Sequence, residues 1–251
     1  MLFRVSMGVV TTLILGIAFW GQISAYGVAA PPKISTESSV SDNPVVHPGD
    51  MKNVPPFSPN RLEKDVHQVV FVRAKTNDKK SGALSAWQKS GDHWVVSLNN
   101  ADVVLGWHGI VSPHDKIEGD GATPAGIYSL SRAFGYYPFP NTKLPYIQLT
   151  DNHYWVDDPL SALYNQLVAK KPDAQSFEKM KRTDGLYKVG IVVEYNTRPV
   201  VARKGSAIFL HVWRGAGSST AGCVAMAEPN LIKLLEWLDP SQHPMIWLEK
   251  E

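Results

Sequence analysis

Cysteine is almost absent from this sequence: the chain of 251 residues contains one, Cys223. A single cysteine cannot form a disulfide bond within its own chain, so a disulfide framework is excluded. The thiol is therefore a small buried side chain, a link to another molecule, or a reactive group. Its neighbours in "SSTAGCVAM" are small, and they are compatible with all three roles.

The chain also has a small net charge and few long apolar runs. The chain carries 25 basic and 23 acidic residues, a net charge of +2, and has no dense Lys/Arg patch with interleaved aromatics. Nucleic acid is therefore not an expected partner. The apolar run "VSMGVVTTLILGIAFWG" is interrupted by Thr11 and Gly16 and is short for a membrane span.

Small residues follow this apolar run, in "ISAYGVAA". The pattern predicts a signal peptide over residues 1–30, cut after Ala30, with an uncleaved membrane anchor as the alternative. In both cases the N-terminal segment engages the export machinery or the membrane. We expect the body of the protein to be exported, to the periplasm or the cell envelope.

The remaining chain divides into a linker and a folded part. Residues 31–66 are rich in Pro and Ser and lack periodicity, which predicts a flexible linker. Residues 67–251 contain short runs of β-branched and aromatic residues between turn signals, which predict strands. One clear helix spans "AEPNLIKLLEWLDP", with Pro229 in its first turn and Pro240 at its end. We expect one mainly β domain of sandwich or barrel type, with a helix after the cysteine segment.

The segment "DPLSALYNQLVAKKPDAQSFEKM" is ambiguous, since its pattern fits either a helix or a long excursion broken at Pro172.

His211 ends the strand-like stretch "AIFLH" and precedes Cys223. If the loop Gly215–Ala221 folds back, imidazole and thiol can meet, and an imidazole favours the nucleophilic thiolate. The backbone N–H groups of Gly222 and Cys223 then offer donors to an oxyanion. The alternative is a packing cysteine and a core histidine, which spacing by itself favours. A metal site is less favoured, because further ligands are lacking nearby.

Three ordered motifs resemble the L,D-transpeptidase catalytic domain family (YkuD-like). "STAGCVAM" is similar to its nucleophile motif, "IEGDGATPAGIYSL" to its Gly-Asp-x-x-Thr-Pro-x-Gly segment, and "FLHVW" to its histidine strand. The matching residues are Thr220, Gly222, Cys223, Val224 and Met226; Gly119, Asp120, Thr123, Pro124 and Gly126; and His211. The resemblance covers most of residues 67–250 and implies a YkuD-like β-sandwich or barrel.

The resemblance implies a cysteine acyltransferase acting on peptidoglycan stem peptides, without metal or organic cofactor. Cys223 is then the nucleophile and His211 the base. The acyl-enzyme passes to an amine, which forms a crosslink, or to water, as in an L,D-carboxypeptidase or endopeptidase. Two other classes are a non-catalytic wall-binding module and a metal-dependent amidase built on the polar segment His108–Asp120.

This sequence departs from the family at two positions beside the nucleophile. Many members have histidine where this chain has Ala221, and arginine, associated with peptide-carboxylate recognition, where it has Ala225. Arg214 is the nearest replacement along the chain. More distant candidates are Arg203 and Arg198, and the other predicted substrate-binding residues are Thr220 and Tyr195. The basic segment "KMKR" is interpreted as an ordinary solvated face.

Overall fold

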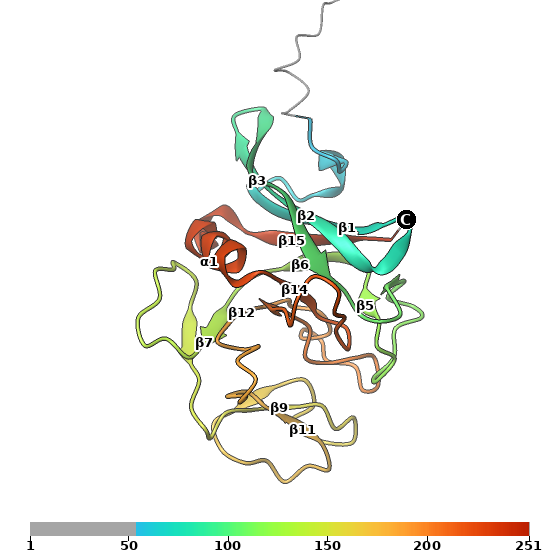
Figure 1. Cartoon of the computed structure of the whole chain (residues 1–251), viewed down its shortest axis with the longest axis vertical. Helices are drawn as coiled ribbons and strands as arrows, with labels where there is room; N and C mark the ends of the chain where they lie inside the picture. The colour runs from blue at the N-terminus through green and yellow to red at the C-terminus, as the bar shows by residue number, and fades with distance from the viewer. Residues whose placement is uncertain (1–53, 251) are drawn as a thin grey trace, which may run out of the picture. The chain divides into compact units, whose positions relative to one another are not determined.

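A curled ten-stranded sheet, like half of a barrel, dominates the computed structural model, which describes residues 54–250 (Figure 1). Its strands lie in the order β6 (Gly126–Ser129), β15 (Met245–Glu249), β1 (Gln68–Lys75), β2 (Asp78–Ser90), β3 (His93–Val104), β14 (Val224–Met226), β13 (Phe209–Val212), β12 (Val189–Val192), β7 (Ala133–Gly135) and β8 (Tyr146–Gln148). The predicted mainly β fold is confirmed.

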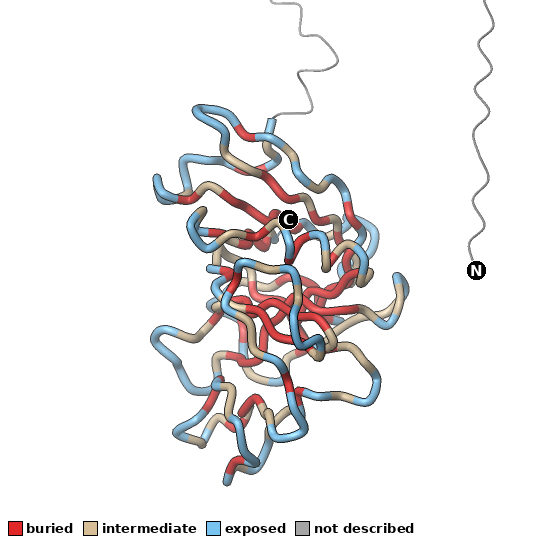
Figure 2. The backbone as a smooth tube through the Cα atoms, turned by 90° about the vertical axis from the view of Figure 1, so that its left-hand side faces the viewer, coloured by how far each residue is buried: buried red, intermediate tan, exposed pale blue. Residues whose placement is uncertain are grey.

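The long strands β1, β2 and β3 form an antiparallel meander. In β1 the run Gln68–Val72 is buried throughout, as its β-branched and aromatic residues predict. Gly91 lies in the turn between β2 and β3 with a φ of 59°, a conformation that suits glycine. Figure 2 shows that buried residues are concentrated in the interior of the folded part, whereas exposed residues lie mostly on its outer loops.

The strand β13 is antiparallel to β12 and parallel to β14. Leu210 pairs with Val224 and His211 with Ala225. Leu210 and Val224 belong to the main core, whereas Phe209 and Cys223 belong to a second cluster with Trp155 and Tyr187. Since side chains alternate between the faces of a sheet, Phe209, His211, Cys223 and Ala225 share one face.

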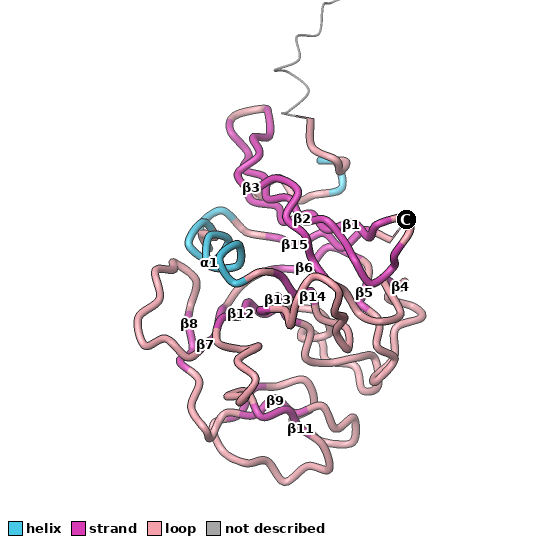
Figure 3. Tube along the Cα trace, in the orientation of Figure 1, coloured by secondary structure: helices cyan, strands magenta, loops and turns pink. Residues whose placement is uncertain are grey.

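The helix α1 (Glu228–Trp237) follows the cysteine segment and packs against β12 and β13 (Figure 3). It buries Leu231, Leu234 and Leu235. The predicted helix is thus confirmed. Two 3-10 turns, Pro59–Arg61 and Pro240–Gln242, complete the helical segments of the described residues.

Two smaller sheets complete the fold. One contains β10 (Leu167–Val168), β9 (Tyr154–Val156) and β11 (Phe177–Lys179), and the other pairs β4 (Ile110–Val111) with β5 (Thr123–Pro124). The segment that the sequence left ambiguous contains β10 and β11 and no helix. Met180 of this segment and Trp155 of β9 pack in one cluster with Cys223, on that face of the main sheet.

The last part of the predicted linker, residues 54–66, packs against the sheet. Phe57 and Val66 are buried, and the Phe57 ring contacts Phe71 and Trp247. The predicted signal peptide and linker residues 31–53 lie outside the described residues. Within residues 54–250 no helix is long and apolar enough to cross a membrane.

Candidate active site

A pocket of about 430 Å³ opens over the face of β13 and β14 that carries Cys223 and His211. Thr220 and Arg214, both predicted from the sequence to contact substrate, line the same pocket. Gly222, predicted as an oxyanion donor, lines it too, so the structure brings five of the predicted site residues to one cavity.

Cys223 is 7% exposed, and its thiol donates to the Ala207 carbonyl over 3.2 Å. Burial raises the pKa of this thiol to about 12, and the charge of Glu178 acts in the same direction. The Phe209 N–H and the cation of Lys116 oppose this rise in pKa but do not outweigh it. The thiol is therefore protonated at neutral pH in the free protein.

His211 is buried near the end of β13, and its Nδ1 lies 2.8 Å from the Val212 carbonyl oxygen. A carbonyl only accepts, so Nδ1–H donates and Nε2 is left as the basic nitrogen. Burial lowers the pKa of His211 to about 4, which keeps the imidazole neutral at pH 7. The Tyr187 ring packs edge-on against the imidazole, with the ring centres 5.2 Å apart.

Cys223 directly precedes β14, and it is a diagonal neighbour of His211 across the parallel pairing of β13 and β14. Neighbouring strands lie about 4.8 Å apart and two residues rise about 6.6 Å, so their Cα atoms are about 8 Å apart. In residues 54–250 no hydrogen bond joins thiol and imidazole, because the thiol is bonded to Ala207 near the start of β13. The two groups share a pocket, and the predicted direct pairing is not made in the free protein.

The loop before the cysteine is held by Thr220, whose hydroxyl donates to the Cys223 carbonyl over 2.6 Å. The same hydroxyl oxygen accepts from the Gly222 N–H over 3.1 Å. The Gly222 N–H was expected to donate to an oxyanion, but it already donates to Thr220. The Cys223 N–H stays a candidate oxyanion donor. Gly222 has a φ of 144°, and a Cβ there would lie 2.9 Å from the Ala122 carbonyl oxygen.

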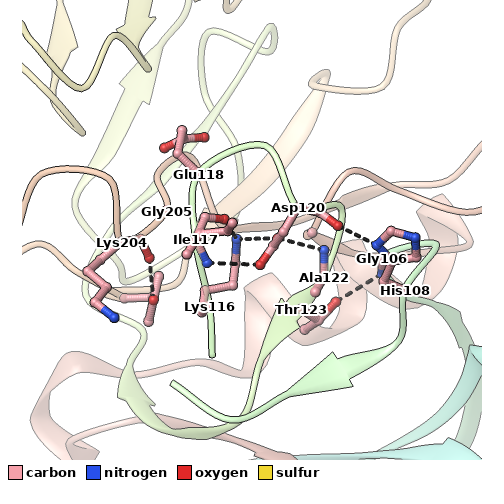
Figure 4. Close-up of polar contacts among 12 residues, drawn as sticks. Gly106, His108, Lys116, Ile117, Glu118, Asp120, Ala122, Thr123, Lys204 and Gly205 are labelled. Atoms are coloured by element: carbon pink, nitrogen blue, oxygen red, sulfur yellow. Dashed lines mark hydrogen bonds and ion pairs between the residues drawn. The ribbon is translucent and has the colours of Figure 1, made fainter. Parts of the chain in front are cut away.

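Ala122 belongs to the Gly-Asp motif, in which Asp120 is the central acceptor (Figure 4). Its carboxylate accepts from Lys116 Nζ over 2.7 Å and from the Ile117 and Ala122 N–H groups over 2.9 Å each. Burial opposes ionisation of Asp120, but these three donors together lower its pKa. The Lys116 side chain is 3% exposed. The motif thus builds the loop that contacts Gly222.

The metal-site alternative on His108–Asp120 gains no support from this geometry. Within residues 54–250 no three or more His, Cys, Asp or Glu side chains are close enough to hold a metal ion. The His108 ring contacts the Asp120 backbone carbonyl, at 2.6 Å, and not its carboxylate.

Charged side chains that were not predicted to contact substrate also line the pocket: Lys116, Glu118, Asp157, Glu178 and Arg182. Glu178 accepts from the Tyr187 hydroxyl over 2.5 Å, and burial raises its pKa. In the "KMKR" segment, Lys179 and Lys181 are exposed as predicted, whereas Arg182 lines the pocket and departs from that interpretation. These residues come from separated segments: the motif loop, the end of β9, β11 and the residues after β11.

Three other predicted residues do not reach the pocket. Tyr195 is buried, with its ring against Tyr128 and its hydroxyl donating to the Lys204 carbonyl over 2.5 Å. Its aromatic surface is therefore used in the core and not in a groove. Arg198 and Arg203 are exposed on a loop that does not line the pocket.

Comparison with known proteins is consistent with this arrangement. Residues 78–246, more than half of the chain, match the YkuD model, described as the L,D-transpeptidase catalytic domain. Among solved structures, the helical cell shape determining protein Pgp2 from Campylobacter jejuni is similar, with 16% identity and a TM-score of 0.39. The alignment covers 74% of this chain and 48% of Pgp2, so the chain spans about half of that protein. No curated protein matches the sequence. The chain therefore belongs to the YkuD family of L,D-transpeptidase catalytic domains.

Proposed function

We propose that this protein is an exported cysteine acyltransferase acting on peptidoglycan stem peptides, with Cys223 as nucleophile and His211 as its base. The observation that carries the proposal is the shared pocket of these two side chains on adjacent strands, in a chain of this family. Peptidoglycan lies outside the cytoplasm, and the signal peptide predicted over residues 1–30 would direct the export.

The first half-reaction starts from a protonated thiol and a neutral imidazole. Rotation about the Cα–Cβ bond of Cys223 moves the thiol away from the Ala207 carbonyl and toward Nε2 of His211. Nε2 then becomes the proton acceptor. The sulfur then attacks the carbonyl at the L-centre of the stem's diamino acid as its proton passes to Nε2. The Cys223 N–H donates to the oxyanion. The C–N bond breaks, His211 returns the proton to the leaving D-alanine amine, and a thioester remains.

The second half-reaction regenerates the thiol. Attack by an amine of a second stem forms a new amide, which is a crosslink, and attack by water releases the shortened stem. His211 again accepts the proton of the attacking group and passes it to the departing sulfur. Both outcomes share the same thioester, so the products distinguish a transpeptidase from a carboxypeptidase or endopeptidase.

The test is intact mass spectrometry after incubation with a carbapenem, whose lactam carbonyl is an electrophile for the activated sulfur. We expect one adduct on the parent protein, none on Cys223→Ala, and slow formation on His211→Ala. His243→Ala is the matched control, because His243 is exposed and outside the pocket. Tetrapeptide stems, with and without an acceptor amine, then identify the second half-reaction.

Two results contradict the proposal. An adduct that persists in Cys223→Ala would assign the reaction to another side chain. A parent protein that forms no adduct and releases no D-alanine from any stem would leave Cys223 as a packing residue, which its burial and raised pKa also fit.

A further inference from the structure

The residue beside His211 on β14 is Ala225, and it has no exposed surface. A methyl group therefore lines the pocket at the position where many family members have an arginine. A methyl group provides no charge for a carboxylate, so any carboxylate of a stem peptide has to find its cation elsewhere in the pocket.

Three cations line the pocket: Lys116, Arg182 and Arg214. Lys116 is buried, donates to Asp120 and to the Ile117 carbonyl, and is balanced one to one by Asp120. Its charge is used in fixing the motif loop. This leaves the two arginines.

Arg182 and Arg214 share one carboxylate, Asp184. Arg182 donates from Nε over 2.9 Å and from Nη2 over 2.7 Å, and Arg214 donates from Nη2 over 3.1 Å. The Arg182 hydrogen bond, followed by weaker contributions that include Arg214, lowers the pKa of Asp184 to about 2, so it is ionised at neutral pH. Two guanidinium groups therefore share one carboxylate at this end of the pocket.

Of the two arginines, Arg182 is the better placed to bind the carboxylate of a ligand. Its guanidinium carbon lies 5.2 Å from the centre of the Tyr187 ring, and that ring packs against His211. Asp184 occupies Nε and Nη2, and within residues 54–250 no hydrogen-bond partner is found for Nη1. Stacking and the Asp184 fork hold the guanidinium in place, which leaves one edge free for a ligand. The side chain of Arg214 is 61% exposed and reaches Asp184 through one nitrogen only.

The charge of Arg182 influences the pKa values of the two catalytic candidates, as its position in the pocket leads us to expect. Its charge acts on the pKa of both His211 and Cys223, whereas Arg214 acts on that of His211. Carboxylates line the pocket as well, and Glu178, which is bonded to Tyr187, is within reach of Arg182. Since Lys116 is paired with Asp120, the two arginines are the groups in the lining that can attract the carboxylate of a ligand.

We propose that Arg182, assisted by Arg214, binds a carboxylate of the stem peptide and takes over the task of the arginine missing at position 225. This inference rests on the proposed acyl transfer. The carboxylate is either that of the terminal D-alanine or that on the side chain of the diamino acid. Charge-assisted bonds to a bidentate guanidinium give the pocket its selectivity for the free acid.

The experiment uses three tetrapeptide stems: the free acid, the C-terminal amide, and the stem with the side-chain carboxylate amidated. KM and kcat are measured from the leaving group released by the full chain. In the parent we expect amidation of the bound carboxylate to raise KM about tenfold or more, with less effect on kcat. In Arg182→Gln the free-acid KM rises by a similar factor, and amidation changes it by less than about twofold. Arg198→Gln, outside the pocket, keeps the parent pattern.

A purely structural role for Arg182 is tested with Asp184→Asn. This change removes the carboxylate that both arginines share and keeps both cations. If Arg182 served only to hold its loop, Asp184→Asn would reproduce the Arg182→Gln pattern for all three peptides, and the proposal would be overturned. We expect Asp184→Asn to keep the discrimination between acid and amide.

Failure of this inference differs from failure of the proposed function. Turnover of all three peptides with equal KM overturns the role of Arg182 and leaves acyl transfer standing. If no peptide is turned over, calorimetric binding of the same peptides to Cys223→Ala decides instead. Weaker binding of one amide than of the free acid supports the role of Arg182, and equal Kd values overturn it.

Discussion

Ala225 is the in-register neighbour of His211 across the parallel pairing of β13 and β14. The side chain at this position points into the same pocket as the imidazole. An arginine here would enter the pocket from β14, whereas the guanidinium of Arg182 lies over the ring of Tyr187.

Returning an arginine to position 225 is expected to rescue the loss of Arg182. In the Arg182→Gln background, Ala225→Arg should lower the KM for the free-acid stem severalfold, because it restores a cation at the pocket. Ala225→Met is the matched control, since it adds similar bulk without charge. Equal KM values for the two double variants would show that a cation at this position does not contribute to binding.

His211 is expected to make the protein sensitive to mild acid. Its pKa is about 4 in the folded protein against 6.5 for the free side chain, so the unfolded chain binds more protons between these values. Stability is then fully present above pH 6.5 and is lost as the pH falls toward 4, by about 3 kcal/mol for this one group. Denaturant unfolding of parent and His211→Gln at pH 7 and pH 4.5 measures the difference.

The variant should lose less stability than the parent over this interval, because glutamine does not titrate. Other groups titrate equally in both proteins and cancel in the comparison. Parallel losses in the two proteins would show that the imidazole is accessible to protons in the folded state.

Gly222 is expected to tolerate no side chain. Its φ of 144° is unfavourable for other residues, and a Cβ would lie 2.9 Å from the Ala122 carbonyl oxygen. Gly222→Ala should lower the free energy of unfolding by at least about 1 kcal/mol and slow acylation of Cys223. Gly217→Ala, in the same loop but with no atom within 4 Å of the new Cβ, should change stability by less than about 0.5 kcal/mol. Equal effects on unfolding would mean that the loop rearranges at little cost.

The buried pair Lys116–Asp120 should contribute far more than an exposed pair. Asp120→Asn leaves the Lys116 ammonium buried without its counter-ion, at a cost of about 3 kcal/mol or more. Asp102→Asn breaks the exposed pair with Lys75 and should cost less than about 1 kcal/mol. Denaturant unfolding at pH 7 compares the two. A small loss in both variants would show that water reaches Lys116.

The features that could be predicted from the sequence are those determined by residues close together along the chain. The valine run of β1 and the helix between Pro229 and Pro240 follow local patterns, and the family resemblance rests on three short motifs. Arg182 was missed because its role depends on the ring of Tyr187 and on the carboxylate of Asp184. Tyr195 was misassigned because a strand-end tyrosine fits a groove and a core equally well until its packing is known.

The position of β15 in the sheet determines when, during synthesis, the sheet can be completed. This last strand lies between β6 and β1 and pairs with both, so the sheet is not continuous until residues 245–249 have been synthesised. The nucleophile strand β14 also pairs with β3, far earlier in the chain. Such long-range pairing slows folding. The ten-stranded sheet is therefore completed only after β15 has left the ribosome.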